Sequence, residues 1–211
     1  MAKLYFYYSA MNAGKTTNLL QSNYNYQERG MGTILFTPKI DNRVREGVIA
    51  SRIGLQAEAY AFSETCDLFD YTKKAVAKSH HKIACILVDE AHFMNRAHVL
   101  QLTDIVDKIK IPVLAYGLRS DYRGEVFEGS QYLFVYADEL CEIKTVCHCG
   151  KKATMNLRFD QNGYAIKEGE QVVISGNDQY ISTCRQHFKD PILRSDIPSL
   201  LNPKTPGFVI R

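Results

Sequence analysis

The stretch that decides the fold is Ser9-Ala10-Met11-Asn12-Ala13-Gly14-Lys15-Thr16. It follows an apolar run typical of a buried strand, Leu4 to Tyr8, and precedes a segment to about Glu28 that we expect to be helical. The glycine lets the loop turn so that its amides can face phosphate oxygens, while Lys15 supplies a charge and Thr16 a hydroxyl for Mg²⁺. The positive end of the helix would face the same phosphates. The sequence therefore predicts a loop that binds a nucleoside triphosphate.

This loop departs from the full phosphate-loop pattern at its first position, where Ser9 stands in place of glycine. Serine adopts a positive φ less readily than glycine, so we expect Ser9 in an ordinary backbone conformation. The alternative interpretation is a Gly-Lys-Thr helix start that binds no nucleotide.

Length and composition exclude several classes of protein. The chain has 211 residues and a net charge of +3, which suits one core with a small appendage. No apolar run approaches a membrane span, and the N-terminus lacks a secretory layout. The basic residues are scattered, which does not favour nucleic acid. Six cysteines without an export signal favour thiols or metal ligation over disulfides. We therefore expect a cytoplasmic α/β protein that binds neither membrane nor nucleic acid.

Strand-like and helix-like segments alternate over the first two-thirds of the chain, which predicts a P-loop (RecA-like) parallel sheet flanked by helices. The further expected strands are Thr33–Thr37, Ile83–Val88, Pro112–Tyr116 and Leu133–Tyr136. The further expected helices are Leu68–Ser79 and Asn95 to about Lys108. The segment Ile40 to Ala61 is a candidate mobile loop near the phosphates. We divide the chain into a nucleotide-binding domain (1–144), a small zinc-binding domain (145–190) and a flexible tail (191–211).

A second nucleotide signal lies at the end of the strand Ile83–Val88, where Asp89 and Glu90 follow. Asp89 could hold Mg²⁺, and Glu90 could orient or deprotonate an attacking hydroxyl or water. The alternative is a helix N-cap and a first-turn acid. The position of the pair, in the next strand but one after a phosphate loop, favours hydrolysis or transfer of a phosphoryl group.

Four soft or borderline metal ligands occur as two close pairs, Cys147, Cys149, Cys184 and His187. Zinc binds such a set tetrahedrally, and Gly150 permits a tight turn after the first pair. We expect a structural zinc site. His148 is a competing imidazole, although its side chain is expected to point away from the neighbouring sulfurs, and Cys141 is a possible substitute ligand. Cys66 and Cys85 are expected to pack as small buried thiols.

Taken together, several motifs in one order resemble the thymidine kinase family found in many bacteria and in the vertebrate cytosol. They are Tyr8–Thr16, Val88–Phe93, Tyr116–Gly124, the Cys147/Cys149 pair, and Val173–Tyr180 before Cys184. The resemblance covers nearly the whole chain. It implies transfer of the γ-phosphoryl group of ATP to the 5′-hydroxyl of thymidine, giving dTMP for nucleoside salvage. It also implies a homotetramer and feedback inhibition by dTTP.

The same resemblance implies roles for individual residues. The loop Ser9–Thr16 would wrap the ATP phosphates with the help of Asp89, Glu90, Ala91 and His92, and Glu90 would be catalytic. The thymidine pocket would comprise Met11, Phe93, Leu118, Tyr122, Val173, Ser175, Gly176 and Tyr180. Asp41 and Arg43 match a flexible segment near the phosphates.

Two positions differ from the common family pattern. His92 stands where glutamine commonly follows the acidic pair, which puts its contacts in doubt. His187 replaces a fourth cysteine and remains an adequate zinc ligand.

Two other functions stay open from the sequence. One is a P-loop ATPase or switch whose zinc ribbon binds nucleic acid or protein. The other is a kinase for another nucleoside, such as deoxyuridine or deoxycytidine.

Overall fold

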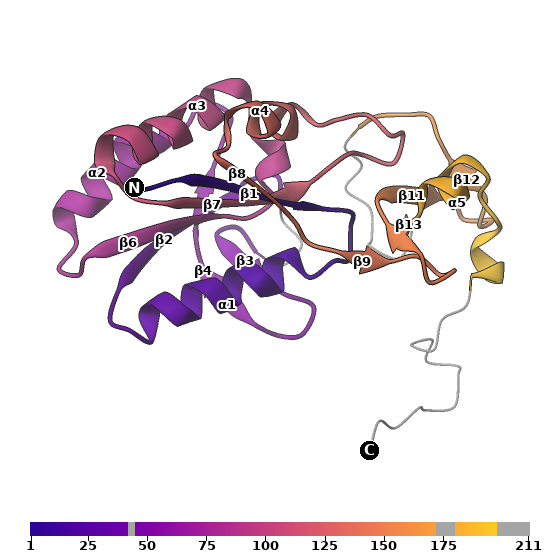
Figure 1. Ribbon diagram of the computed structural model, residues 1–211, viewed down its shortest axis with the longest axis horizontal. Helices are drawn as coiled ribbons and strands as arrows, with labels where there is room; N and C mark the ends of the chain where they lie inside the picture. The colour runs from indigo at the N-terminus through magenta and orange to yellow at the C-terminus, as the bar shows by residue number, and fades with distance from the viewer. Residues whose placement is uncertain (42–44, 172–179, 198–211) are drawn as a thin grey trace, which may run out of the picture.

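The computed structural model describes residues 1–41, 45–171 and 180–197. Its centre is a six-stranded parallel sheet in the order β5-β2-β6-β7-β1-β8 (Figure 1). The strands are β1 (Leu4–Ser9), β2 (Gly32–Pro38), β5 (Tyr60–Phe62), β6 (Ile83–Val88), β7 (Val113–Leu118) and β8 (Glu139–Glu142). The α/β architecture predicted from the sequence is confirmed.

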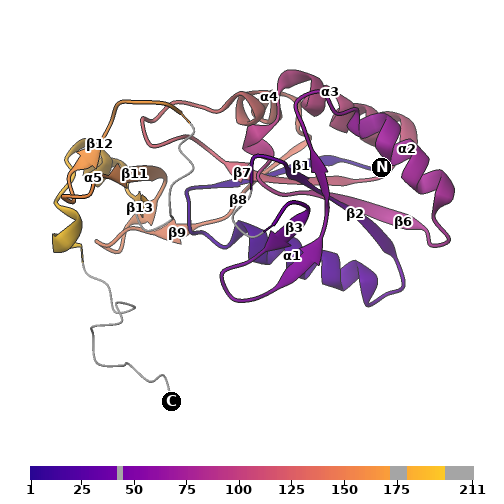
Figure 2. The same cartoon turned by 180° about the vertical axis from the view of Figure 1, so that it is seen from behind.

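Helices cover both faces of the sheet. Figures 1 and 2 show α2 (Leu68–Lys78), α3 (Arg96–Asp104) and α4 (Glu128–Tyr136) on one face, and α1 (Lys15–Gln27) with the hairpin of β3 (Val48–Ala50) and β4 (Gln56–Glu58) on the other. A π-helical turn, η2 (Ile105–Ile109), extends α3, and a 3-10 turn, η1 (Ala91–Phe93), follows β6. No helix of the described ranges is long and apolar enough to cross a membrane.

Strand β6 shows why the sheet is buried on both faces. Ile86 and Val88 pack into the core beneath α2, α3 and α4, whereas Cys85 and Leu87 pack against α1. Because successive side chains of a strand point to opposite faces, a continuous apolar run is what a strand between two helix layers requires. Cys85 is a buried thiol, as expected, and burial raises its pKa to about 12.

The C-terminal region lies beyond the end of β1 and forms small sheets of its own (Figure 1). Its elements are β9 (Thr145–Val146), β10 (Lys152–Ala153), β11 (Met155–Phe159), β12 (Ala165–Ile166), β13 (Tyr180–Thr183), α5 (Arg185–Lys189) and the 3-10 turn η4 (Arg194–Asp196). Ile197, near the end of the described ranges, packs with Leu157 and Phe159. The division into domains and tail stays a prediction.

The prediction of a strand at Leu133–Tyr136 is wrong, because these residues form the last turn of α4. The run is rich in β-prone residues, but Leu133 is fully buried together with Gly129 and Ser130, a helical spacing. Packing on the core therefore overrides propensity. The sheet is instead completed by β5 and β8, two short edge strands that the sequence analysis missed.

Candidate active site

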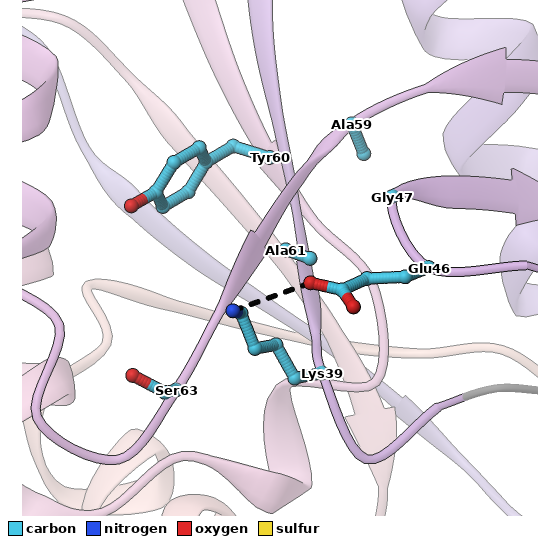
Figure 3. A pocket seen from close by; sticks show the side chains of 7 residues that line it. All are labelled: Lys39, Glu46, Gly47, Ala59, Tyr60, Ala61 and Ser63. Carbon is cyan, nitrogen blue, oxygen red and sulfur yellow. Dashed lines mark ion pairs between the residues drawn. The ribbon is translucent and has the colours of Figure 1, made fainter.

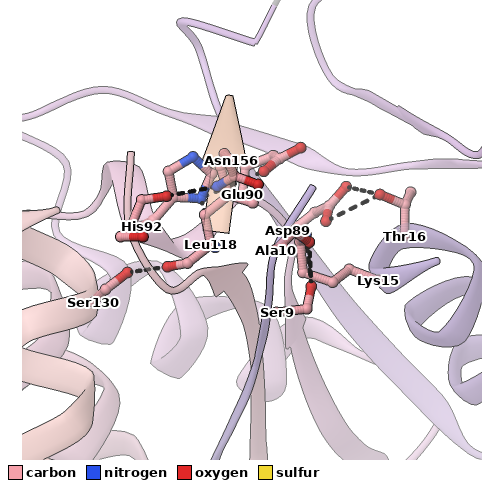
Figure 4. Close-up of polar contacts among 11 residues, drawn as sticks. Ser9, Ala10, Lys15, Thr16, Asp89, Glu90, His92, Leu118, Ser130 and Asn156 are labelled. Carbon is pink, nitrogen blue, oxygen red and sulfur yellow. Dashed lines mark hydrogen bonds and ion pairs between the residues drawn. The ribbon is translucent and has the colours of Figure 1, made fainter. Parts of the chain in front are cut away.

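The phosphate loop joins β1 to α1 and has the predicted turn. Gly14 is left-handed, with a φ of 82°, while Ser9 ends β1 and has no positive φ. The Lys15 ammonium donates to Ser9 Oγ at 3.0 Å and to the Ala10 carbonyl at 3.1 Å, and the Ser9 hydroxyl donates to the same carbonyl at 2.7 Å (Figure 4). The serine that replaces glycine thus holds the lysine inside the loop.

The loop and the acidic pair meet at the carboxyl ends of β1 and β6. The Thr16 hydroxyl donates to Asp89 Oδ2 at 3.2 Å. The backbone of Asp89 is held in turn by its N–H, which donates to the Phe36 carbonyl at 2.9 Å. Asp89 is only 2 % exposed. A hydroxyl and a carboxylate oxygen are ligands that Mg²⁺ accepts, so this pair fits the predicted metal position.

Glu90 turns the chain out of β6 into η1. Its backbone is left-handed, with φ 47° and ψ 40°, and its side chain does not cap the 3-10 turn. The carboxylate Oε2 lies 3.4 Å from His92 Nδ1 (Figure 4). The helix-capping alternative for the acidic pair is therefore not what the structure shows.

One cavity of about 460 Å³ connects these groups. It is lined by Met11, Asn12, Ala13, Gly14, Lys15, Thr16, Thr17, Ala50, Ser51, Arg52, Ile53, Glu90 and Leu118. Residues 50–53, at the end of β3 and in the turn after it, lie beside the phosphate loop, so this part of the segment Ile40–Ala61 is near the loop and includes a strand. The mobility of the segment stays a prediction. Arg52 brings a second positive charge to this cavity. An arginine between Ser51 and Gly54, in a segment already expected near phosphates, was the signal that could have found it.

A second cavity, of about 450 Å³, lies at the end of β2 and β5 (Figure 3). Lys39 and Glu46 face each other across it with Nζ and Oε1 3.2 Å apart. Because these charges offset one another, the cavity presents no net charge from this pair to a ligand.

The predicted metal ligands come together in the C-terminal region. One ligand atom from each of Cys147, Cys149, Cys184 and His187 lies within 4.8 Å of all the others, and none of the cysteines forms a disulfide. Representative separations are 3.9 Å between Cys149 Sγ and Cys184 Sγ, and 3.4 Å between Cys147 Sγ and His187 Nδ1. A tetrahedral zinc with Zn–S bonds of ~2.3 Å separates its ligand atoms by about 3.8 Å, so the donor set fits zinc.

The competing ligands lie outside this group. His148 does not point away from its neighbours' sulfurs, as we expected, because its Nδ1 lies 3.6 Å from Cys147 Sγ. Its ring lies against His187 with the centroids 4.2 Å apart, so it flanks a ligand. Cys141 lies in β8. Cys66, which we expected to be buried, is only half-buried, although it packs against the main core.

Comparison with known proteins decides the family. The family model described as thymidine kinase matches residues 2–188. The chain belongs to the thymidine kinase family. Among its relatives are proteins named thymidine kinase from Legionella pneumophila strain Lens (61% identical over 189 residues, 90% of each chain) and Vibrio vulnificus strain YJ016 (57% over 192 residues, 91% of this chain and 99% of the relative). Another, from Salmonella typhimurium strain LT2, is 54% identical over 200 residues (95% and 97%).

For this thymidine kinase family member, the structure brings together only part of the predicted nucleoside pocket. Met11 and Leu118 line the cavity beside Glu90. Phe93 packs against His92, with ring centroids 4.1 Å apart, and is not among the lining residues. Tyr122 is only 2 % exposed, and its single hydroxyl proton is shared between the carbonyls of residues 168 and 170, at 3.2 Å and 2.9 Å.

Of the remaining predicted site residues, the structure describes some, and others lie outside the described ranges. The Tyr180 ring lies 6.3 Å from that of Tyr122. Asp41 follows β2. Arg43, Val173, Ser175 and Gly176 lie outside the described residues. Phe127, whose ring is 4.6 Å from His92, was missed because nothing local in the sequence joins the two.

Proposed function

We propose that this chain transfers the γ-phosphoryl group of ATP to the 5′-hydroxyl of thymidine, giving dTMP and ADP. The observation that carries the proposal is the meeting of Thr16 with Asp89 at 3.2 Å beside a cavity that Lys15 and Glu90 also line. The family match and the names of the relatives support thymidine as the acceptor.

In the proposed reaction the loop binds and orients the triphosphate. Lys15 exchanges its bonds to Ser9 and Ala10 for phosphate oxygens, and the loop amides face the same group. Thr16 and Asp89 hold Mg²⁺, which when bound neutralises charge that develops on the phosphates.

Glu90 acts on the acceptor. Its carboxylate orients the 5′-hydroxyl in line with the γ-phosphorus and accepts the hydroxyl proton late in the transfer. The O–H bond breaks as the new O–P bond forms, the proton bonds to a Glu90 oxygen, and ADP leaves with the electrons of the broken P–O bond. A carboxylate is a weak base toward an alcohol, so orientation contributes as much as proton removal.

The C-terminal region supplies base recognition in this proposal. Cys147, Cys149, Cys184 and His187 would hold a structural zinc, which would fix the C-terminal region near its two ends. The family resemblance suggests that this region recognises the pyrimidine through backbone hydrogen bonds. The family resemblance alone supports a cytoplasmic homotetramer with dTTP as feedback inhibitor.

A nucleoside panel with ATP tests the substrate. We expect dTMP from thymidine, measured by chromatography. Faster product formation from deoxyuridine or deoxycytidine would show that this nucleoside, and not thymidine, is the preferred substrate. Phosphate release only in the presence of DNA would favour the ATPase alternative.

The variant Glu90→Gln tests the mechanism. We expect turnover to fall by about two orders of magnitude or more, because the amide cannot accept the proton, while ATP binding stays largely unchanged. Glu28→Gln, an exposed position after α1, is the matched control. Near-normal turnover of Glu90→Gln would remove Glu90 from its proposed role.

A further inference from the structure

His92 is a buried polar side chain next to Glu90, which lines the cavity. Only 3 % of it is exposed, and its ring lies between those of Phe93 and Phe127, at centroid distances of 4.1 Å and 4.6 Å. Its backbone also lies close to β7, since a Cβ on Gly117 would lie 3.0 Å from the His92 nitrogen. An imidazole enclosed on these sides has little freedom to rotate.

The Nδ1 atom of this ring has two polar neighbours. The Leu118 N–H donates to it at 3.3 Å, and Glu90 Oε2 lies 3.4 Å away (Figure 4). The Leu118 carbonyl in turn accepts from the Ser130 hydroxyl at 2.6 Å. A chain of contacts therefore runs from α4 through the end of β7 to His92 and on to the proposed catalytic carboxylate.

The two neighbours require opposite hydrogen-bonding roles of Nδ1, because the Leu118 N–H needs an acceptor and an ionised Glu90 needs a donor. An unprotonated Nδ1 has one lone pair in the ring plane, so it accepts either from the Leu118 N–H or from a proton carried by Glu90. A protonated Nδ1 donates to an ionised Glu90 and no longer accepts from Leu118. His92 can therefore make a hydrogen bond to Glu90 in either of its protonation states, each time in place of the bond from the Leu118 N–H. A carboxylate that takes a proton from an alcohol passes through both states.

We propose that His92 is the positioning residue for Glu90, with Nδ1 as the atom that holds the carboxylate toward the acceptor hydroxyl. This inference rests on the role proposed for Glu90. Its physical basis is orientation, because a small misplacement of a reacting group lowers the rate steeply even when binding is unchanged.

The decisive experiment compares His92→Leu with His92→Asn. The two replacements have nearly the same shape and both remove the ring, but asparagine carries an amide atom at the bond position of Nδ1. Relative to wild type, we expect kcat to fall about tenfold to a hundredfold in the leucine variant. The kcat of the asparagine variant should be about tenfold higher than that of the leucine variant, and the two variants should have similar KM values for ATP. Equal kcat values would overturn the proposal.

A double-mutant cycle with Glu90→Gln tests whether His92 acts through Glu90. In the Glu90→Gln background, we expect His92→Leu to change kcat by less than about twofold. If His92→Leu lowered kcat by the same factor in the Glu90→Gln background as in wild type, His92 would act independently of Glu90, which overturns the proposal. If His92→Leu does not fold, His92→Phe, which keeps a ring and lacks the nitrogen, takes its place in both experiments.

The control is His98→Leu, which removes another buried histidine, on α3. It is expected to lower the melting temperature and leave kcat unchanged. A wild-type protein that does not phosphorylate thymidine would contradict the proposed function itself. An active wild type with equal leucine and asparagine variants would contradict only the role of His92.

Discussion

The hydroxyl of Ser9 accepts from the Lys15 ammonium and donates to the Ala10 carbonyl, so the Lys15 ammonium lies inside the loop. Because Lys15 is nearly buried, these bonds satisfy a charge that would otherwise be costly. In the proposed reaction, bound phosphates would replace these bonds. At the scale of single residues, the site is arranged around contacts that a substrate can replace.

Asp89→Asn is the prediction for the metal contact. The amide carries no charge and presents N–H groups to the cation, so we expect the Mg²⁺ concentration for half-maximal activity to rise about tenfold or more. A Mg²⁺ titration of turnover at fixed ATP measures it, with Asp70→Asn, part of an exposed ion pair with Lys74, as the control. An unchanged Mg²⁺ requirement would assign Asp89 a purely structural contact with Thr16.

Among the elements, α4 fixes the loop that carries the acidic pair. It packs directly on η1, where a Cβ on Gly129 would lie 2.5 Å from the Ala91 carbonyl oxygen and 2.9 Å from that of His92. A glycine is therefore required at this crossing because any side chain would clash with η1, and not because the backbone needs a positive φ.

We predict that Gly129→Ala pushes α4 away from η1. The expected loss of stability is about 1–3 kcal/mol, as for other overpacked cores, with a fall in kcat because Glu90 and His92 move. Thermal unfolding and steady-state kinetics measure the two effects. Gln131→Ala, an exposed position on the same helix, should change neither. A stable and fully active Gly129→Ala variant would contradict the tight crossing.

Helix α3 gives a pH-dependent contribution to stability. Its His98 is 1 % exposed, and burial lowers the pKa of this imidazole. Below the unfolded pKa of about 6.5 the unfolded chain binds a proton that the folded chain resists, so this contribution is lost as pH falls below that value. We expect His98→Gln to lose less stability than wild type between pH 7.5 and 5.5 in urea titrations. An identical pH dependence of both proteins would contradict this assignment.

How much of this the sequence predicts depends on how local each feature is. The loop from Ser9 to Thr16 and the strand before Asp89 were predicted because their signals lie in a few consecutive residues. Arg52, Phe127 and the helical state of Leu133 were not, because packing between distant segments determines them. The contact between Asp89 and Thr16 was predictable only through the general rule that parallel strands share one ligand-binding edge.

At the scale of the whole molecule, the C-terminal region holds the phosphate loop from outside. The Met11 N–H donates to Asn156 Oδ1 at 2.7 Å, and the Met11 carbonyl accepts from the Ser182 hydroxyl. Asn156 also donates to the Ser120 carbonyl at 2.8 Å. Because β11 and β13 provide these groups, hydrogen bonds connect the region with the Cys/His group to the phosphate loop.

Removal of zinc is therefore predicted to act on both sites. We expect a chelator to lower the melting temperature by several degrees and to weaken thymidine and ATP binding together, since metal binding is coupled to folding. Calorimetry of the stripped protein, with Zn²⁺ then added back as the control, measures this. Unchanged melting and unchanged affinities after complete zinc removal would rule it out.

The left-handed backbone of Glu90 has an evolutionary consequence. A residue with a side chain holds this conformation at a cost of roughly 1–2 kcal/mol, which glycine avoids. Replacing Glu90 by glycine would relax the turn and delete the carboxylate in one step. A screen for heat-resistant variants that did not measure turnover is therefore expected to select Glu90→Gly.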